Sequence, residues 1–155
     1  MRRDACMQGK HNEIEFFNHV AERWDSIRQT NREKLQDMVT LAAVQSGDRI
    51  LDIGCGTGVL EAELLSTIGD TGQIIATDFS EAMIAQANAK YGVLPNVRFI
   101  VQDIWETKFA EPFDLIFCLN FFPHAGDKQG FISHVHQWLK PGGHLIIMHD
   151  ISREA

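Results

Sequence analysis

The feature that most constrains this chain is a glycine-rich turn directly behind an apolar run. Residues 49–53 predict a short buried strand that contains one acid, Asp52. Glycines then fill three alternate positions, Gly54, Gly56 and Gly58. Because glycine adopts backbone conformations closed to other residues, such a loop turns sharply and lets another molecule approach its backbone. We expect the helix that follows to present unpaired N–H groups to that molecule.

Strands and helices are predicted to alternate along the rest of the chain. Helices are expected at 59–68, 80–91 and 128–139, and strands at 73–77, 96–101, 113–119 and 144–149. Such alternation predicts an α/β fold with a doubly wound, Rossmann-like parallel sheet covered by helices on both faces. Ligands bind these sheets outside the carboxyl ends of the strands, which is where the glycine loop lies.

The residues before the first strand are predicted to be helical. Phe17 and Trp24 belong to an apolar set at helical spacing, and residues 30–33 form a capping-box pattern that opens a second helix at Thr30. We expect residues 1–45 to form a helical cap or lid and residues 46–155 to form one compact ligand-binding domain. An amphipathic helix that only covers the core is the alternative.

Composition limits the partners. The formal net charge is −7, and repulsion by this charge opposes binding to nucleic acid or to an anionic membrane. The longest apolar runs fall short of the ~20 residues that a membrane helix needs. Three widely spaced cysteines suggest neither a disulfide framework nor a zinc site and fit a reducing cytoplasm. We expect no metal, because His134 and His136 point to different faces of a predicted helix.

The spacing around the loop narrows the ligand. A dinucleotide fingerprint needs a third glycine where Val59 stands, and the Gly-Lys-Ser/Thr ending of a phosphate loop is absent. Asp78 ends the second predicted strand, where a carboxylate can accept hydrogen bonds from both hydroxyls of a ribose. We therefore expect a ligand that contains a ribose and no pyrophosphate.

Five segments together resemble the class I S-adenosylmethionine-dependent methyltransferases, in particular the small-molecule type 11 group that includes enzymes of quinone biosynthesis. LDIGCGTG is similar to the first family motif, ATDFS to the second and VQDI to the segment with the adenine-contacting acid. FDLIFCLNFFPH resembles the fourth-strand motif, and LKPGGHLII resembles the segment leading into the fifth strand. The resemblance implies a strand order of 3-2-1-4-5 and S-adenosylmethionine as the cofactor.

The resemblance also implies roles for residues at matching positions. Asp52 would hold the ammonium of the cofactor's methionine portion, and Asp78 would take the ribose hydroxyls. Asp103 would accept from the adenine amino group. The complete set of expected cofactor residues is Asp52, Gly54, Cys55, Gly56, Gly58, Asp78, Phe79, Asp103, Ile104 and Asn120. Each acid also has a purely structural alternative. Asp52 can brace the turn, and Asp78 and Asp103 can cap the segments that follow them.

The expected activity is methyl transfer to a small-molecule acceptor by in-line displacement, which demands alignment more than a dedicated catalytic group. Asn120 and His124 follow the fourth strand and are the candidate catalytic residues, His124 as a general base. His124 can equally be an ordinary loop histidine. Phe121 and Phe122 are expected either to wall the acceptor site or to belong to the core. A non-catalytic domain that binds the cofactor or its demethylated product, as a sensor or assembly partner, is the alternative function.

The resemblance breaks down at the carboxyl end. These methyltransferases usually add an antiparallel hairpin after the fifth strand, and this chain stops a few residues past it. The segment HLIIMHD would then form an apolar edge strand. Such an edge can pair with another chain, so we hypothesise a homodimer through it. A fragment of a longer protein and a short self-associating variant both fit this pattern, and the acceptor does not follow from any residue.

Overall fold

The structure is a computed structural model that describes residues 2–149, with side chains from residue 8 onward. The helices are α1 (Arg2–Val20), α2 (Trp24–Ile27), α3 (Arg32–Leu41), α4 (Glu61–Ile68), α5 (Glu81–Tyr91) and α6 (Lys128–His136). The strands are β1 (Arg49–Ile53), β2 (Gln73–Asp78), β3 (Val97–Val101), β4 (Phe113–Leu119) and β5 (Leu139–Met148). Short 3-10 helices are η1 (Ala21–Arg23), η2 (Ile104–Glu106) and η3 (Phe122–Ala125). Residues 150–155, the end of the expected domain and of HLIIMHD, lie outside the described residues.

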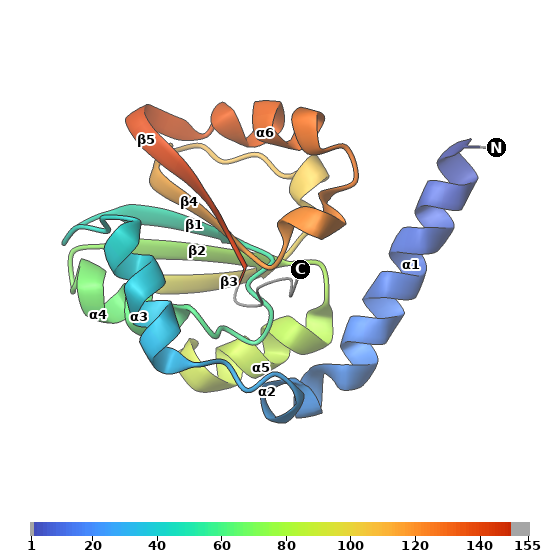
Figure 1. Cartoon of the computed structure of the whole chain (residues 1–155), viewed down its shortest axis with the longest axis horizontal. Coiled ribbons are helices and arrows are strands. Elements are labelled where there is room, and N and C mark those ends of the chain that lie inside the picture. The colour runs from blue at the N-terminus through green and yellow to red at the C-terminus, as the bar shows by residue number, and fades with distance from the viewer. Residues whose placement is uncertain (1, 150–155) are drawn as a thin grey trace, which may run out of the picture.

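The strands form one parallel sheet in the order β3-β2-β1-β4-β5 (Figure 1). The expected α/β doubly wound fold and its strand order are therefore confirmed. The chain runs outward from β1 to β3, and then returns to place β4 on the other side of β1. The crevice for a ligand in such a sheet lies at this reversal, at the carboxyl ends of β1 and β4.

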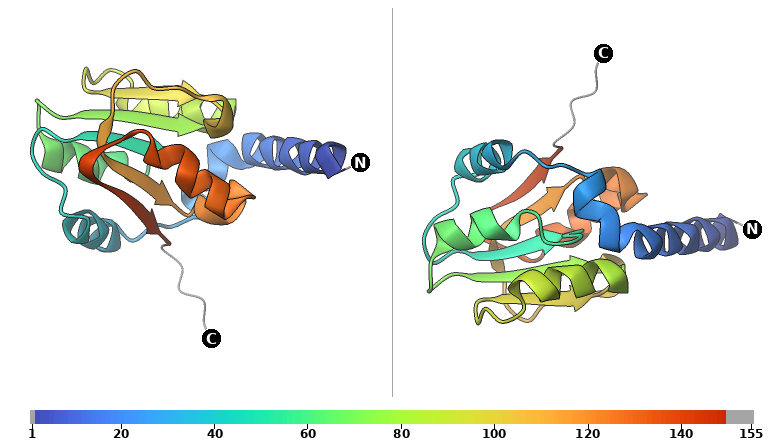
Figure 2. Two further views of the ribbon diagram at one scale, coloured as in Figure 1. Left: turned by 90° about the horizontal axis from the view of Figure 1, so that it is seen from above. Right: turned by 90° about the horizontal axis from the view of Figure 1, so that it is seen from below.

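Alternate residues of β1 face different helical layers. Ile50 belongs to the core shared with α3, α4 and α5, whereas Leu51 and Ile53 belong to the core shared with α6. All three side chains are buried, and each burial stabilises the fold by roughly 1.5–3 kcal/mol. Figure 2 shows the two helical layers on opposite sides of the sheet. Since strand side chains alternate, Asp52 lies on the same face as Ile50, toward α4.

The segment before β1 has two parts. Leu35, Met38 and Val39 of α3 belong to the buried core, so α3 covers the sheet as the later helices do. By contrast, α1 and η1 pack against α5, and the first half of α1 projects beyond the sheet (Figures 1 and 2). The boundary expected near residue 45 stays a prediction. The part of this segment that lies at the ligand edge of the sheet is α1 to α2.

Some predicted boundaries are wrong. Asn31, not Thr30, caps α3, because the Asn31 side chain accepts from the Lys34 N–H at 3.3 Å. Helix α4 starts at Glu61 rather than at residue 59, after a series of turns. Helix α5 begins within one residue of its predicted start, and the Ser80 hydroxyl caps it by accepting from the Met83 N–H at 3.1 Å.

Strand β5 also starts earlier than predicted, at Leu139. The Phe113 N–H donates to the Trp138 carbonyl oxygen at 2.7 Å, which ends α6 early and brings the chain onto β4. Residues 140–143 form an irregularity inside this strand: Phe113 pairs with Leu139, but Leu115 pairs with His144. The left-handed Gly142 makes this irregularity possible.

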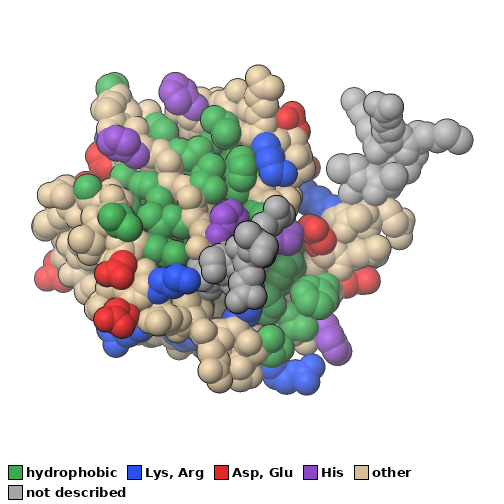
Figure 3. All heavy atoms as spheres, viewed as in Figure 1, with side chains coloured by type: hydrophobic (Ala, Val, Ile, Leu, Met, Phe, Trp, Pro, Cys, Tyr) green, Lys and Arg blue, Asp and Glu red, His purple; other side chains and the backbone are tan. Residues whose placement is uncertain are grey.

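Among the described strands, β5 pairs with β4 alone, so the expected edge position is confirmed. Figure 3 shows hydrophobic side chains gathered over the part of the surface that β5 crosses. Ile146 and Met148 pack there, partly buried, against the core under α3. Whether a second copy pairs with this edge stays a prediction. None of the helices described by the structure is long and apolar enough to span a membrane.

Candidate functional site

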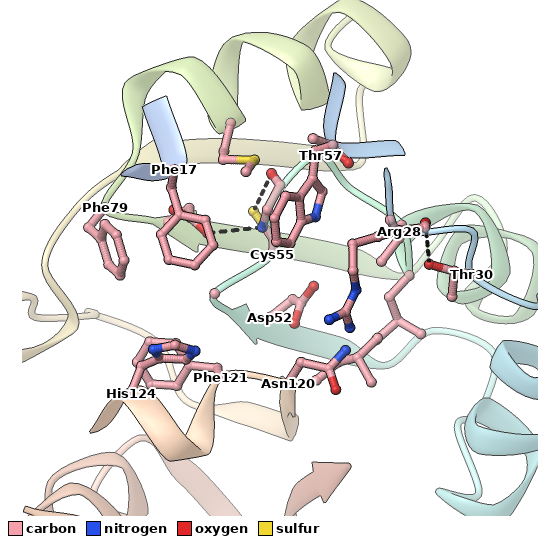
Figure 4. A pocket seen from close by; sticks show the side chains of 18 residues that line it. Phe17, Arg28, Thr30, Asp52, Cys55, Thr57, Phe79, Asn120, Phe121 and His124 are labelled. Atoms are coloured by element: carbon pink, nitrogen blue, oxygen red, sulfur yellow. Dashed lines mark hydrogen bonds between the residues drawn. The ribbon is translucent and has the colours of Figure 1, made fainter. Parts of the chain in front are cut away.

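Two adjoining cavities lie at the carboxyl ends of the central strands, beneath α1 and α2. They share five residues and differ in their far ends. The first cavity (Figure 4) is lined by Phe17, Trp24, Arg28, Thr30, Asp52, Gly54, Cys55, Gly56, Thr57, Val59, Leu60, Asp78, Phe79, Met83, Leu119, Asn120, Phe121 and His124. The second is lined by Gly9, Lys10, Glu13, Ile53, Gly54, Thr77, Asp78, Phe79, Gln102, Asp103, Ile104, Trp105, Phe121, His124, Ala125 and Gly126. Apart from Gly58, the expected cofactor residues therefore line one continuous site.

The glycine loop uses its N–H groups inside the protein. The N–H groups of Gly54 and Cys55 both donate to the Thr77 carbonyl oxygen, at 2.8 and 3.0 Å. Gly56 donates to Asp78, and Gly58 donates to the Cys55 carbonyl oxygen at 3.0 Å. All four N–H groups are thus engaged inside the protein, which disfavours a phosphate at this loop. The unpaired N–H groups expected from the helix after the loop stay a prediction, because these four residues precede that helix.

Two of the loop glycines are required for different reasons. Gly54 has φ of +73°, and a Cβ there would lie 2.5 Å from the Phe121 ring. Gly56 has φ of +55°, but a Cβ there would meet no atom within 4 Å, because it faces open space. Gly54 thus lets the loop pack against the segment after β4, whereas Gly56 presents bare backbone to the cavity.

Gly58 lies apart from the other expected cofactor residues, and its cofactor role stays a prediction. It lines neither cavity, and a Cβ there would lie 3.2 Å from the Tyr91 ring and 3.4 Å from Ala87. Its place is therefore structural, because it allows α5 to pack closely on the loop.

Asp78 locks the end of β2 to the loop. One carboxylate oxygen accepts from the Gly56 N–H and the other from the Ser80 N–H, each at 2.9 Å. Burial raises the pKa of Asp78, and hydrogen bonds from the Ser80 and Gly56 backbones oppose the rise. A carboxylate has about four acceptor sites, so lone pairs remain for hydroxyl groups in the cavity.

Asp52 faces the same cavity from β1 and is buried, with 2% of its surface exposed. Its Oδ1 atom has no hydrogen-bond partner among the described residues. Burial is the main cause that raises the pKa of Asp52, and the charge of Asp78 adds to the rise. A buried acceptor left unpaired costs free energy, which a donor from a ligand in the cavity would recover.

The second cavity holds the residues expected around an adenine ring. Asp103 caps η2, accepting from the Trp105 N–H at 3.1 Å, and it also accepts a hydrogen bond from Lys10 of α1. Ile104 is buried at the cavity wall. Phe79 packs edge-on against Phe17, with ring centroids 5.8 Å apart. The Asp103 carboxylate is thus shared between a cap, a lysine and the cavity.

The amino-terminal helices are tied to the loop as well as to the sheet. Asp25 accepts from the Thr57 hydroxyl and from Lys90, and Lys90 also donates to the Thr57 carbonyl oxygen at 2.9 Å. Burial alone would raise the pKa of Asp25, but Lys90 and Thr57 outweigh it and lower the pKa. Asn18 of α1 accepts from the Ser80 hydroxyl at 2.6 Å. These contacts hold α1 and α2 over the mouth of the site.

The candidate catalytic residues lie at the rim. Asn120 has φ of +59°, an uncommon backbone conformation for a residue other than glycine and one often found at functional sites. His124 is exposed, its Nδ1 atom lies 3.4 Å from the Glu13 carboxylate, and its ring meets Phe17 edge-on at 6.0 Å. Phe121 and Phe122 pack on Phe131, so both contribute to the core, and Phe121 also lines the cavities.

From the sequence, Arg28 and Glu61 had no expected role, and Thr30 was expected only to cap a helix. Arg28 directly follows α2. Its guanidinium points into the first cavity, toward the Asp52 and Asn120 side chains (Figure 4). Its position beyond an apolar helix at the mouth was the available clue. Glu61 is fully buried at the start of α4, where an acid among apolar residues was the clue.

Two further groups bear on chemistry. Burial raises the pKa of the Cys55 thiol, and the nearby acids raise it further, so this thiol is not activated as a nucleophile. Within residues 8–149, no group of three or more histidine, cysteine or acidic side chains is placed to hold a metal ion.

The known proteins to which this chain is similar are described as methyltransferases. The family model "Methyltransferase domain" matches residues 50–143. The ubiquinone/menaquinone biosynthesis C-methyltransferase of Teredinibacter turnerae is 29% identical over 141 residues, 85% of this chain and 57% of that protein. The malonyl-(acyl-carrier protein) O-methyltransferase 2 of Ilyobacter polytropus is 36% identical over 97 residues, 63% of this chain and 37% of that protein.

A solved structure shares the fold. The S-adenosylmethionine-dependent methyltransferase of Thiobacillus denitrificans, in complex with S-adenosyl-L-homocysteine, superimposes with a TM-score of 0.70 at 25% identity. The match covers 84% of this chain and 52% of that one. The chain thus spans between 37% and 57% of the length of these three relatives.

Proposed function

Because the chain belongs to the class I S-adenosylmethionine-dependent methyltransferases, we propose that it binds S-adenosylmethionine and directs methyl transfer to a small-molecule acceptor. The family model covers residues 50–143, which include the whole glycine loop and the ends of β1, β2 and β4. The matched residues thus include the part of the chain that is expected to bind the cofactor. The methyl acceptor is proposed here only as a class.

The observation that carries the proposal is the polarity of the glycine loop. Its N–H groups at Gly54, Cys55, Gly56 and Gly58 are already used. Acids outnumber cations in the lining of the two cavities, with Glu13, Asp52, Asp78 and Asp103 against Lys10 and Arg28. An anionic pyrophosphate would meet an excess of carboxylates there, which repel it. A sulfonium with an ammonium group carries the opposite charge and fits.

Each portion of the cofactor has matching residues. Asp52, with its unpaired Oδ1 atom, and the guanidinium of Arg28 would hold the ammonium and the carboxylate of the methionine portion. Asp78 would accept from the ribose hydroxyls. Asp103 and Ile104 would contact the adenine, with Phe79 packed against it. Gly56, whose missing side chain leaves open space, lets the cofactor approach the backbone.

When bound, the cofactor supplies an electrophilic methyl group for in-line displacement. The protein's part is to align the acceptor and to exclude water. Phe17, Trp24 and Phe121 give the cavity apolar walls that do both. His124, beside Glu13, stands where it can take a proton from an acceptor at the rim. Asn120 would position the acceptor or the cofactor from the end of β4.

Calorimetric titration tests the proposal. Purified protein is titrated with S-adenosylmethionine and with S-adenosylhomocysteine, and transfer of isotope-labelled methyl groups is then followed with a panel of small acceptors. Binding of both ligands together with acceptor-dependent transfer would support the enzyme. Binding without transfer to any acceptor would favour the sensor or assembly role, and a folded protein that binds neither ligand would overturn the proposal.

Self-association through the β5 edge is a separate proposal. It rests on the edge position of β5 and on the hydrophobic surface around it. Light scattering across a range of protein concentrations tests it, because a constant monomeric mass would contradict a dimer.

A further inference from the structure

A second buried acid lies behind Asp52 and has no role in the proposed cofactor contacts. Glu61 is the first residue of α4, and none of its surface is exposed. Both of its carboxylate oxygens lack a hydrogen-bond partner among the described residues, as does Oδ1 of Asp52. An ionised carboxylate in such a place would be very costly, so the arrangement requires a counter-charge or a proton.

The two acids lie on the same side of the sheet and interact. Asp52 faces α4 because it alternates with Leu51 and Ile53, and α4 begins with Glu61. Burial raises the pKa of Glu61 well above its usual range, and the charge of Asp52 raises it further. A proton on one of the two carboxyl groups would supply the donor for a hydrogen bond between them. Two interacting carboxylates in a buried site do not both ionise, because each disfavours the charge of the other.

The remaining charged and titratable groups around the pair leave the Glu61 carboxyl group without a bonded cation among the described residues. They are Lys90 and Tyr91 of α5, Asp78 of β2, Cys55 of the loop, Cys118 of β4, and Arg28 and His124 at the cavity. Lys90, the cation that acts on Glu61, is already engaged by Asp25 and by the Thr57 carbonyl oxygen. No cation from these elements bonds either Glu61 oxygen.

We propose that Asp52 and Glu61 share one proton in the ligand-free protein and release it to solvent when the ligand's ammonium comes to lie beside Asp52. The shared proton lies between two carboxyl oxygens and lowers the charge of the pair from −2 to −1. The arriving cation makes full ionisation favourable, and the proton leaves. Glu61 is thus a positioning residue that acts through Asp52. The inference rests on the proposed function, because it takes the ammonium to be that of the cofactor or its product.

The test is proton counting by calorimetry with two ligands. S-adenosylhomocysteine carries an amino group that is protonated below a pH of about 8. 5′-Methylthioadenosine keeps the adenosine and the sulfur but lacks the amino-acid portion. Titrations at pH 6.5 in buffers of different ionisation enthalpy give the number of protons released. We expect a release of about half to one proton with S-adenosylhomocysteine and almost none with 5′-methylthioadenosine.

The pH profile and a matched pair of variants complete the test. Affinity for S-adenosylhomocysteine should rise with pH between 5.5 and 7.5, by up to about tenfold per unit. Glu61→Gln removes the partner that holds the proton, so it should flatten this rise and abolish the release. Glu63→Gln makes the same change on the same helix, at a residue paired with Arg32 at 2.7 Å, and should retain both.

The outcomes separate the inference from the function beneath it. Binding of S-adenosylhomocysteine without proton release, or an unchanged pH profile in Glu61→Gln, overturns the inference and leaves the proposed function standing. Failure of folded protein to bind either ligand overturns the proposed function, and the inference with it. If Glu61→Gln does not fold, the difference between the two ligands on the native protein still decides.

Discussion

The two oxygens of the Asp78 carboxylate bond two different segments: one accepts from the Gly56 N–H in the glycine loop and the other from the Ser80 N–H at the start of α5, each at 2.9 Å. Asp78 is therefore both a cap and a brace, and it fixes the loop against β2. The same carboxylate lines both cavities. A ligand that bonds Asp78 thus meets an acceptor that is already held in place.

Replacing Asp78 tests the ribose contact. We expect Asp78→Ala to weaken binding of S-adenosylmethionine and S-adenosylhomocysteine by about tenfold or more, because charge-assisted hydrogen bonds of roughly 1.5 kcal/mol or more are lost. Calorimetric titration measures the effect. Asp70→Ala removes an exposed acid at the opposite end of β2 and should leave the affinity unchanged. Equal affinities in native protein and Asp78→Ala would count against a ribose at this position.

The ring of Phe17 tests whether α1 acts as a lid. Phe17 lines the first cavity and meets Phe79, Trp24 and His124 edge-on. We expect Phe17→Ala to weaken ligand binding by about tenfold, since removing a well-packed aromatic side chain from a site costs at least ~1.4 kcal/mol. Phe16→Ala is the matched control, because Phe16 is 56% exposed and lies outside both cavities. If both variants bind as the native protein does, α1 only covers the core.

Arg28 tests the contact with the amino-acid carboxylate. We expect Arg28→Ala to weaken binding of S-adenosylhomocysteine by about tenfold to a hundredfold, the loss of a charge-assisted pair of roughly 1.5–3 kcal/mol. 5′-Methylthioadenosine, which has no carboxylate, should bind both proteins alike. Fluorescence or calorimetric titration with the two ligands gives the comparison. A similar loss for both ligands would indicate that Arg28 supports the cavity and does not bind the carboxylate.

The sheet and the cofactor edge could be predicted from the sequence because both depend on local patterns. Short apolar runs between segments of helical periodicity predicted the five strands. The position of Gly54 and Gly56 directly after β1 predicted which edge of the sheet binds the ligand. The predicted boundaries at Asn31 and Leu139 were wrong because two local structures compete at each of these positions. Asn31 and Thr30 are both favourable N-cap residues, so the pattern alone does not decide between them. The Trp138 carbonyl oxygen accepts from the Phe113 N–H of β4, so the chain leaves the helix before Trp138.

The polar details of the site could not be predicted because they depend on contacts distant in sequence. The use of the loop N–H groups requires the position of Thr77, which only the pairing of β1 with β2 fixes. Gly58 was assigned to the cofactor by its motif, but its neighbour is Tyr91 on α5. Lys10 bonding Asp103 joins positions 93 residues apart. Arg28 follows the same rule, since its place in the first cavity depends on where α2 lies in the folded chain.

The pair of Asp52 and Glu61 also predicts how stability depends on pH. In the unfolded chain these acids ionise near pH 3.9 and 4.3. In the folded protein burial raises the pKa of Asp52 to about 7 and that of Glu61 well above its usual range. The folded state therefore holds more protons from about pH 4 upward, and the free energy of unfolding falls as the pH rises through the folded pKa values.

Glu61→Gln removes one of the two titrating groups and keeps the volume of the side chain. The variant should lose less stability than the native protein as the pH rises from 5 to 8. At pH 8 we expect it to be more stable by about 1 kcal/mol or more, which raises the melting temperature by roughly 2–4 °C for a chain of this size. Thermal unfolding followed by circular dichroism at several pH values measures this. Glu63→Gln, which loses the pairing with Arg32, should lower stability without changing the pH dependence. Parallel stability profiles for native protein and Glu61→Gln would mean that Glu61 does not hold a proton in this range, because a raised pKa in the folded state must appear as a difference in slope.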